Sequence, residues 1–299
     1  MKTQIVSILR RVFSALIAAF VLGGCVSLSE PEGSLRKEII FAVTDINELI
    51  KFNAGQPQRI LATVAVRGLQ PGENIMGIDY RVARGVLFAL GSSGRIYTLN
   101  TATGAATPVG GTPFAVPLSG REFGFDFNPT VDRIRIVSDA GQNLRAHPDT
   151  GAVVDSDAAA SGLQIDGELA YAKNDANFGK TPRIIAAGYT YNKTNEKITT
   201  NFAVDGGLGL LVTQGTREGV MPAVSPNTGQ LYTVGSLNVG VLDRVSFDIS
   251  DINNVAFIAG TAKGAVASKF YLINLATGAA AFIGTIGGGK AVRGIAIEP

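Results

Sequence analysis

Short apolar runs, each bounded by Gly, Asn, Asp or Pro, fill the chain from about residue 39 onward. The runs are rich in Val, Ile, Phe, Tyr and Thr and are much shorter than typical helices, a pattern that predicts β-strands. Several runs are joined by Thr-Gly or Asn-Gly-like turns, in which Gly adopts a positive φ without a Cβ clash and closes a hairpin. The pattern therefore predicts an all-β fold.

The strand pattern repeats along the chain. The segment at residues 96–106 (IYTLNTATGAA) recurs at residues 270–280 as FYLINLATGAA. Three of the four intervals between the turn glycines are 47 or 49 residues long; these glycines are Gly55, Gly104, Gly151, Gly229 and Gly278. A second element recurs out of phase with the turn, as Gly77-Ile78-Asp79, Gly124-Phe125-Asp126 and Ser246-Phe247-Asp248. Repeats of this length indicate a radial or stacked architecture.

One repeat contains four predicted strands, and four strands in about 49 residues are typical of a β-propeller blade. First strands are expected near residues 75, 122, 167, 244 and 292, which gives five four-stranded blades. The one interval of 78 residues leaves a surplus of about 29, explained by long loops at 192–197 and 215–225 or by a degenerate sixth blade. We prefer five blades, and a β-sandwich is a weaker alternative.

The two ends of the repeat region complement each other. Residues 292–297 resemble a first strand with no successors, and residues 39–43, 47–52 and 59–66 resemble second to fourth strands without a first. We expect these segments to form one blade that closes the ring. Residues 39–299 would then be a single propeller domain.

The N-terminus has the pattern of an export signal. Lys2, Arg10 and Arg11 precede an apolar run at residues 12–21 that is too short to span a bilayer. The following Leu22-Gly23-Gly24-Cys25 resembles the bacterial lipobox, which implies cleavage of residues 1–24 and acylation of Cys25. An ordinary cleaved signal with an incidental Cys is the alternative.

The segment at residues 25–38 is polar, contains Pro31 and Gly33, and is expected to be a flexible tether. Val26 follows the Cys where Asp would favour inner-membrane retention, so we expect the outer membrane. Two or more acyl chains would give stable anchoring.

Composition narrows the classes of function. Charged residues make up 17% of the chain and the net charge is +2, which indicates a buried core and excludes a nucleic-acid-binding surface. One Cys and one His exclude an internal disulfide framework and a His-rich zinc site. Removal of residues 1–24 would leave a formal charge of about −1.

Residues 124–145 (GFDFNPTVDRIRIVSDAGQNLR) and the following 147–151 (HPDTG) carry a longer signature. This signature resembles that of a bacterial secreted family, domain-of-unknown-function family 4394, and the resemblance extends over about residues 38–298. It implies an exported, propeller-like domain. It implies no activity and no catalytic residues.

The same stretch holds the densest polar cluster of the chain, comprising Asp126, Asp132, Arg133, Arg135, Asn143 and Arg145. Arg133 and Arg135 lie two apart and so share one face of a strand, and Arg145 can reach them from the next strand. The cluster is either an anion or carboxylate site or a structural network. We favour a structural network in which Asp126 and Asp132 neutralise the arginines.

Catalytic and metal chemistry have weaker support. His147 can act as a general base, but it precedes a turn and is expected at the surface, and no Gly-x-Ser-x-Gly elbow is present. The acidic loops at 155–157 and 248–253 could bind Ca²⁺, although turn formation explains them equally well. We therefore assign no catalytic or metal residues and expect no cofactor other than the Ca²⁺ alternative.

Two functions are consistent with these patterns. The first is a monomeric cell-envelope lipoprotein, anchored to the membrane by lipid, whose propeller is a binding or scaffold module for a protein or glycan. The second is a hydrolase or lactonase-type enzyme that uses acidic loop residues and Ca²⁺. The missing catalytic constellation favours the first, because the second rests on fold analogy.

Overall fold

A computed structural model describes residues 30–299. The predicted signal peptide and Cys25 lie outside the described residues. Within residues 30–299, no helix is long and apolar enough to cross a membrane. Strands dominate this part of the chain, and its helical turns are three short 3₁₀ segments: η1 (Val82–Arg84), η2 (Pro226–Thr228) and η3 (Ile286–Gly288).

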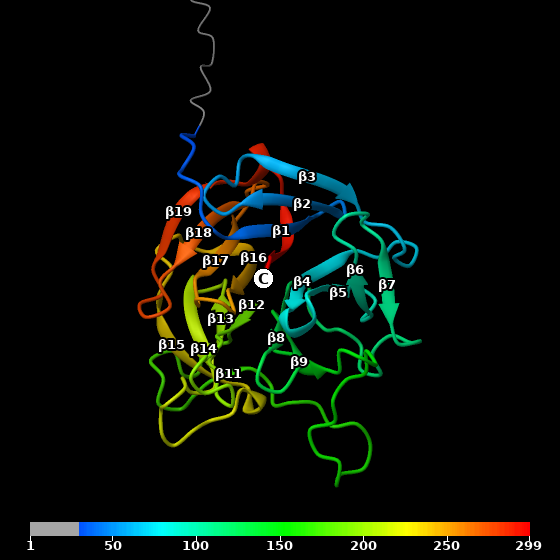
Figure 1. The fold of residues 1–299 in the computed structure, drawn as a ribbon. Coiled ribbons are helices and arrows are strands. Elements are labelled where there is room, and N and C mark those ends of the chain that lie inside the picture. Colours follow the sequence, from blue (N-terminus) through cyan, green and yellow to red (C-terminus); the bar gives the residue numbers. More distant parts are fainter. Residues whose placement is uncertain (1–29) are drawn as a thin grey trace, which may run out of the picture. The chain divides into compact units, whose positions relative to one another are not determined.

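The strands form five sheets arranged around a common axis (Figure 1). The innermost strands are β20, β4, β8, β12 and β16, and each contacts the innermost strand of the next sheet around the complete ring. The unit from Glu32 to Pro299 is therefore a five-bladed β-propeller, as the repeat predicted.

We number the blades from the one that contains both ends of the ring. Blade 1 consists of β20 (Val292–Ile297), β1 (Ile39–Thr44), β2 (Glu48–Asn53) and β3 (Ile60–Ala65). Blade 2 consists of β4 (Ile75–Arg81), β5 (Val86–Gly91), β6 (Ile96–Leu99) and β7 (Ala106–Val109). Blade 3 consists of β8 (Phe123–Asn128), β9 (Arg133–Ser138) and β10 (Asn143–Ala146).

The last two blades complete the ring. Blade 4 consists of β12 (Ile184–Tyr189), β13 (Asn201–Asp205), β14 (Leu210–Gln214) and β15 (Gln230–Ser236), with the short β11 (Ala170–Tyr171) at its outer edge. Blade 5 consists of β16 (Leu242–Ile249), β17 (Ala256–Ala262), β18 (Lys269–Ile273) and β19 (Ala280–Thr285).

Blade 1 joins the two ends of the ring, which confirms the predicted closure. Strand β20 pairs antiparallel with β1, with Ile297 opposite Ile40 and Gly294 opposite Val43. Ile40 and Ile295 are fully buried in this blade. The closing strand thus contributes both backbone hydrogen bonds and core packing.

Blades 3 and 4 depart from the regular repeat. The fourth innermost strand, β12, begins at Ile184, so the prediction of a first strand near residue 167 is wrong. Blade 3 lacks a full fourth strand and has only an isolated bridge between Ala146 and Val153. The period failed here because an irregular segment at residues 147–183 replaces that strand, and long loops at 190–200 and 215–229 supply the rest of the surplus.

Apolar side chains fill the spaces between neighbouring blades. Phe52 of blade 1 packs edge-to-face on Phe270 of blade 5, with ring centroids 5.3 Å apart, and Phe88 of blade 2 packs similarly on Phe127 of blade 3 at 5.1 Å. Burial of one such ring stabilises the fold by about 1.5–3 kcal/mol. Packing of apolar side chains between neighbouring blades therefore stabilises the ring.

The Gly of the Gly-apolar-Asp element allows the innermost strands to approach closely. A Cβ on Gly77 would lie 2.7 Å from the Cβ of Phe125, and a Cβ on Gly124 would lie 2.6 Å from the backbone nitrogen of Ala187. Real Cβ atoms do not approach this closely, so a side chain would push the strands apart. The element is thus a packing motif of the axis.

Candidate functional site

One face of the propeller is formed where the innermost strands end. The loops between first and second strands lie there, at residues 82–85, 129–132, 190–200 and 250–255, together with residues 298–299 after β20. We call this surface the strand-end face. Cavities that open on it are described below from the axis outward.

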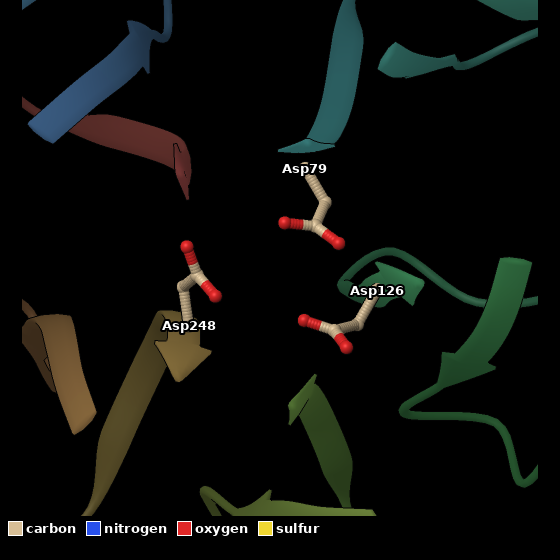
Figure 2. A group of neighbouring side chains, drawn as sticks. All are labelled: Asp79, Asp126 and Asp248. Atoms are coloured by element: carbon tan, nitrogen blue, oxygen red, sulfur yellow. The ribbon is translucent and has the colours of Figure 1, made fainter. Parts of the chain in front are cut away.

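Three aspartates, one from each of three blades, meet at the axis below this face (Figure 2). Asp79 lies on β4, Asp126 on β8 and Asp248 on β16, and each offers a carboxylate oxygen within 4.8 Å of the others. They are the Asp of the repeated Gly-apolar-Asp element. We call them the central aspartates.

Each central aspartate also ties its blade to the next one. Asp79 Oδ2 accepts a hydrogen bond from the backbone N–H of Phe127 (2.7 Å), and Asp126 Oδ1 accepts one from Tyr189 (2.9 Å). Asp248 Oδ2 accepts one from Ile297 (2.5 Å). These three hydrogen bonds link blade 2 to blade 3, blade 3 to blade 4 and blade 5 to blade 1, so the aspartates contribute to ring closure.

The same bonds show which blades lack the aspartate. Tyr189 and Ile297 each follow the position that corresponds to Asp, and these positions hold Gly188 in β12 and Ala296 in β20. The carboxylates are therefore confined to blades 2, 3 and 5.

Burial without a cationic partner dominates the electrostatics of the central aspartates. Each side chain is more than nine-tenths buried, and among the described residues no Lys or Arg forms an ion pair with them. Burial and the neighbouring carboxylates raise the pKa of Asp79 and Asp126 well above the ordinary value. Burial raises the pKa of Asp248 to about 7 and that of Asp251 to about 6. Near neutral pH the cluster therefore retains protons. A cation that bound between the carboxylates would displace these protons.

The space between the central aspartates is small. It is a cavity of about 20 Å³ that is also lined by Ser250, Asp251 and the chain end at Pro299. This volume accommodates one water molecule or one ion. Carboxylate oxygens are ligands that Ca²⁺ prefers, so the central aspartates are the residues that could hold one.

A larger cavity of about 540 Å³ adjoins the central one on the strand-end face. Its polar wall includes Arg81, which is held between Asp132 and Asp149 with nitrogen–oxygen distances of 2.5 Å to each. These hydrogen bonds raise the pKa of Arg81 and lower that of Asp149. Arg84, Tyr191, Glu196, Asn128 and Asp251 also line this cavity. Both signs of charge and an aromatic side chain thus surround this space.

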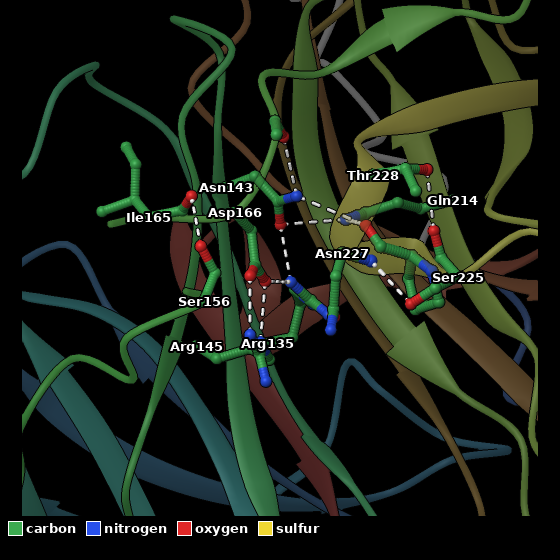
Figure 3. A network of polar contacts seen from close by, with 12 residues as sticks. Arg135, Asn143, Arg145, Ser156, Ile165, Asp166, Gln214, Ser225, Asn227 and Thr228 are labelled. Carbon is green, nitrogen blue, oxygen red and sulfur yellow. Dashed lines mark hydrogen bonds and ion pairs between the residues drawn. The ribbon is translucent and has the colours of Figure 1, made fainter. Parts of the chain in front are cut away.

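The arginine cluster of blade 3 lies beside this cavity and forms a buried network (Figure 3). Arg135 Nη1 contacts Asp166 Oδ2 at 2.6 Å, and both side chains are only 1% exposed. Arg145 binds the same carboxylate through Nε and Nη2, both at 2.8 Å. The remaining hydrogen bonds of Arg135 go to neutral groups, the side chains of Asn143, Asn227 and Tyr189.

The structure corrects the charge partners expected for this cluster. It brings Arg133, Arg135, Asn143 and Arg145 together, and Arg145 lies directly opposite Arg135 in the sheet. Asp126 and Asp132 do not neutralise them, because Asp126 lies at the axis and Asp132 pairs with Arg81. The partner is Asp166, which no pattern indicated because it lies in the irregular segment before β12.

The other candidate residues lie in turns. His147 is half-buried, and its Nδ1 accepts a hydrogen bond from the backbone N–H of Asp149 in the predicted turn. Asp155 is part of the 155–157 loop, and its Oδ1 accepts hydrogen bonds from the backbone N–H groups of Asp157 and Gln164. Among residues 248–253, Asp248 is one of the central aspartates, and Asp251 lines the same small cavity.

Comparison with known proteins identifies the sequence family. The profile of the family described as Domain of unknown function (DUF4394) matches residues 48–296. No curated protein matches the chain.

The solved structures that match this chain share little sequence with it. A protein of unknown function from Bacteroides thetaiotaomicron has a TM-score of 0.44 and 14% identity, over 83% of this chain and 58% of that one. The dihydro-heme d1 dehydrogenase NirN has a TM-score of 0.36 and 11% identity, over 85% and 45%. A chain of a mitotic checkpoint complex has a TM-score of 0.35 and 8% identity, over 84% of this chain and 62% of that one. The chain thus spans less than two thirds of the length of each of these proteins.

Proposed function

We propose that this chain, which belongs to the family described as Domain of unknown function (DUF4394), is a binding module of the bacterial cell envelope. It binds a glycan or protein partner on the strand-end face. The observation that carries this proposal is the gathering of cavities on one face of a rigid ring, with volumes of about 540 and 330 Å³ and with charged and aromatic walls. Binding sites are concave and combine apolar surface with a few convergent polar groups.

The proposed cellular location of the module rests on its N-terminal sequence. The lipobox-like Leu22-Gly23-Gly24-Cys25 supports cleavage before Cys25, acylation of its thiol and anchoring of the chain in the outer membrane. The tether would be shorter than the predicted residues 25–38, because Gly33 and Arg36 are hydrogen-bonded to Gln56 and Asn53 of blade 1. The residues before Gly33 would leave the propeller free to engage envelope components as a monomer.

A blocking variant tests the binding face. Ala83 is exposed and lines the larger cavity, so Ala83→Trp would fill the cavity without disturbing the core. Ala265 is exposed in the loop between β17 and β18, at the opposite end of the strands, and Ala265→Trp is the matched control. The full-length protein, extracted from membranes, is applied to an array of neutral and acidic envelope glycans and to purified outer-membrane proteins. We expect Ala83→Trp to abolish binding and Ala265→Trp to retain it; the reverse pattern, or equal binding by both, would place the site elsewhere.

The second candidate is a hydrolase or lactonase-type enzyme with a bound Ca²⁺. The specific observation in its favour is the set of three buried carboxylates without a cationic side chain. A bound Ca²⁺ would polarise a substrate carbonyl at the axis. Elemental analysis of the purified protein tests this candidate. Stoichiometric calcium in the native protein that is absent from Asp126→Asn would support this candidate. A calcium-free protein whose unfolding temperature does not change when Ca²⁺ is added would rule it out.

A further inference from the structure

A cavity of about 330 Å³ lies between blades 3 and 4 on the strand-end face. Arg133 and Arg135 of β9 and Arg145 of β10 line it, together with Tyr189, Val131 and Val154. This volume lies within the range of ligand pockets, at its small end.

The charges around this cavity do not balance. Arg135 and Arg145 share a single carboxylate, that of Asp166. Among the residues that the structure describes, no carboxylate lies within ion-pair distance of Arg133. Three guanidinium groups therefore face the cavity with one carboxylate, which leaves an excess of two positive charges. Arg133 is half-exposed, so its positive charge is available to an anion from solution.

The guanidinium groups are also held in place. Arg133 Nη1 donates to the backbone oxygen of Asp132 (2.9 Å), and Arg145 is fixed by its bidentate contact with Asp166 (Figure 3). Nε and Nη2 of Arg133 and Nη1 of Arg145 make no hydrogen bond with any described residue. Rigid guanidinium groups with unused donors are suited to bidentate recognition of a carboxylate. Binding therefore loses little side-chain entropy, because contacts within the protein already orient the guanidinium groups.

We propose that this cavity binds the carboxylate group of an acidic sugar, with Arg133 as the main contact and Arg145 as the second. The inference rests on the proposed binding function and names the ligand class for the same face. The aliphatic side chains of Val131 and Val154 support a sugar over a free inorganic anion, because they can contact the apolar face of a sugar ring. Arg135 and Asp166 act as positioning residues.

The test uses acidic glycans and their methyl esters, because esterification removes the charge and keeps the ring. Calorimetric titration compares the full-length protein with Arg133→Gln and with Arg121→Gln. Arg121 is exposed just before β8, at the opposite end of that strand from the cavity, and is the matched control. We expect the acid to bind at least tenfold more tightly than its ester. Arg133→Gln should remove this preference without a shift in unfolding temperature, and Arg121→Gln should behave like the unmodified protein.

Several outcomes would overturn the inference. These are equal affinity for acid and ester across all acidic glycans, unchanged binding by Arg133→Gln, or inorganic phosphate that binds as tightly as the acid. If neutral glycans bind the native protein and Ala83→Trp abolishes that binding, the proposed binding function stands while this inference fails. Failure of the proposed function instead appears as an absence of any binding that Ala83→Trp or Arg133→Gln removes.

Discussion

Replacing Asp248 by Asn tests whether the central aspartates retain protons near neutral pH. Asn preserves the size of the side chain and an oxygen that accepts the hydrogen bond from Ile297, but it cannot ionise. In the native protein, burial raises the pKa of Asp248 from 3.8 to about 7. The substitution therefore isolates the cost of charging this site.

The sign and size of the effect follow from linkage between proton binding and folding. When the pH rises above about 4, the unfolded chain releases this proton while the folded chain keeps it until about pH 7, so stability is lost across that window. A difference of about three pKa units corresponds to about 4 kcal/mol in total, of which about 3 kcal/mol is lost between pH 5 and pH 8. This loss is large against a typical free energy of unfolding of about 5–15 kcal/mol.

Urea denaturation at pH 5 and pH 8, with a chelator present, measures the effect. We expect Asp248→Asn to lose about 3 kcal/mol less than the native protein between the two conditions, because Asp79, Asp126 and Asp251 remain in both, so that the variant is the more stable protein at pH 8. Asp155→Asn, in an exposed loop, should follow the native protein. Equal pH dependence of the native protein and Asp248→Asn would refute the reasoning. If added Ca²⁺ restores stability at pH 8 to the native protein alone, a cation replaces the protons.

Three further predictions concern the anchor, the ring and the arginine network. Mass spectrometry of the membrane fraction should find a mature chain that begins with acylated Cys25; retention of residues 1–24 or an unmodified thiol would contradict the lipoprotein assignment. Truncation after Lys290 removes β20 and should lower the unfolding temperature sharply, because β1 loses its partner, whereas an unchanged temperature would argue against a structural role for ring closure. Arg135→Ala should lower the free energy of unfolding by about 3–5 kcal/mol, since it leaves Asp166 partly unpaired and buried. A loss below about 1 kcal/mol would show that the pair is not structural.

The sequence was informative about the ring because local turn chemistry repeats with the blade. The Thr-Gly turns at Gly104 and Gly278 close equivalent hairpins, and both glycines have the positive φ that the turn requires. Since a propeller repeats one blade around an axis, the period and the complementary ends sufficed to predict five blades and their closure. The period was misleading at β12, where an irregular segment replaces a strand and no local pattern marks the change.

The site was less accessible to the sequence because its parts come from different blades. Asp79, Asp126 and Asp248 were visible as members of the repeated element, and an equivalent position on innermost strands implies convergence at the axis. That inference requires knowing which strand of the repeat is innermost. Asp166 offered no such signal, because its position depends on the path of an irregular segment and on the buried arginines that it meets.

Pairing of β20 with β1 also has consequences for the order of assembly. Strand β1 precedes the other strands in the chain and β20 follows them, so the pairing of Ile40 with Ile297 joins residues that are separated by nearly the whole domain. Contacts this distant in sequence form slowly, because a long loop must close first. Until then, the unpaired edge of β1 is open to another chain, and such edges are templates for aggregation. A chain held unfolded until β20 has emerged would avoid this hazard, and the proposed export would provide such a delay.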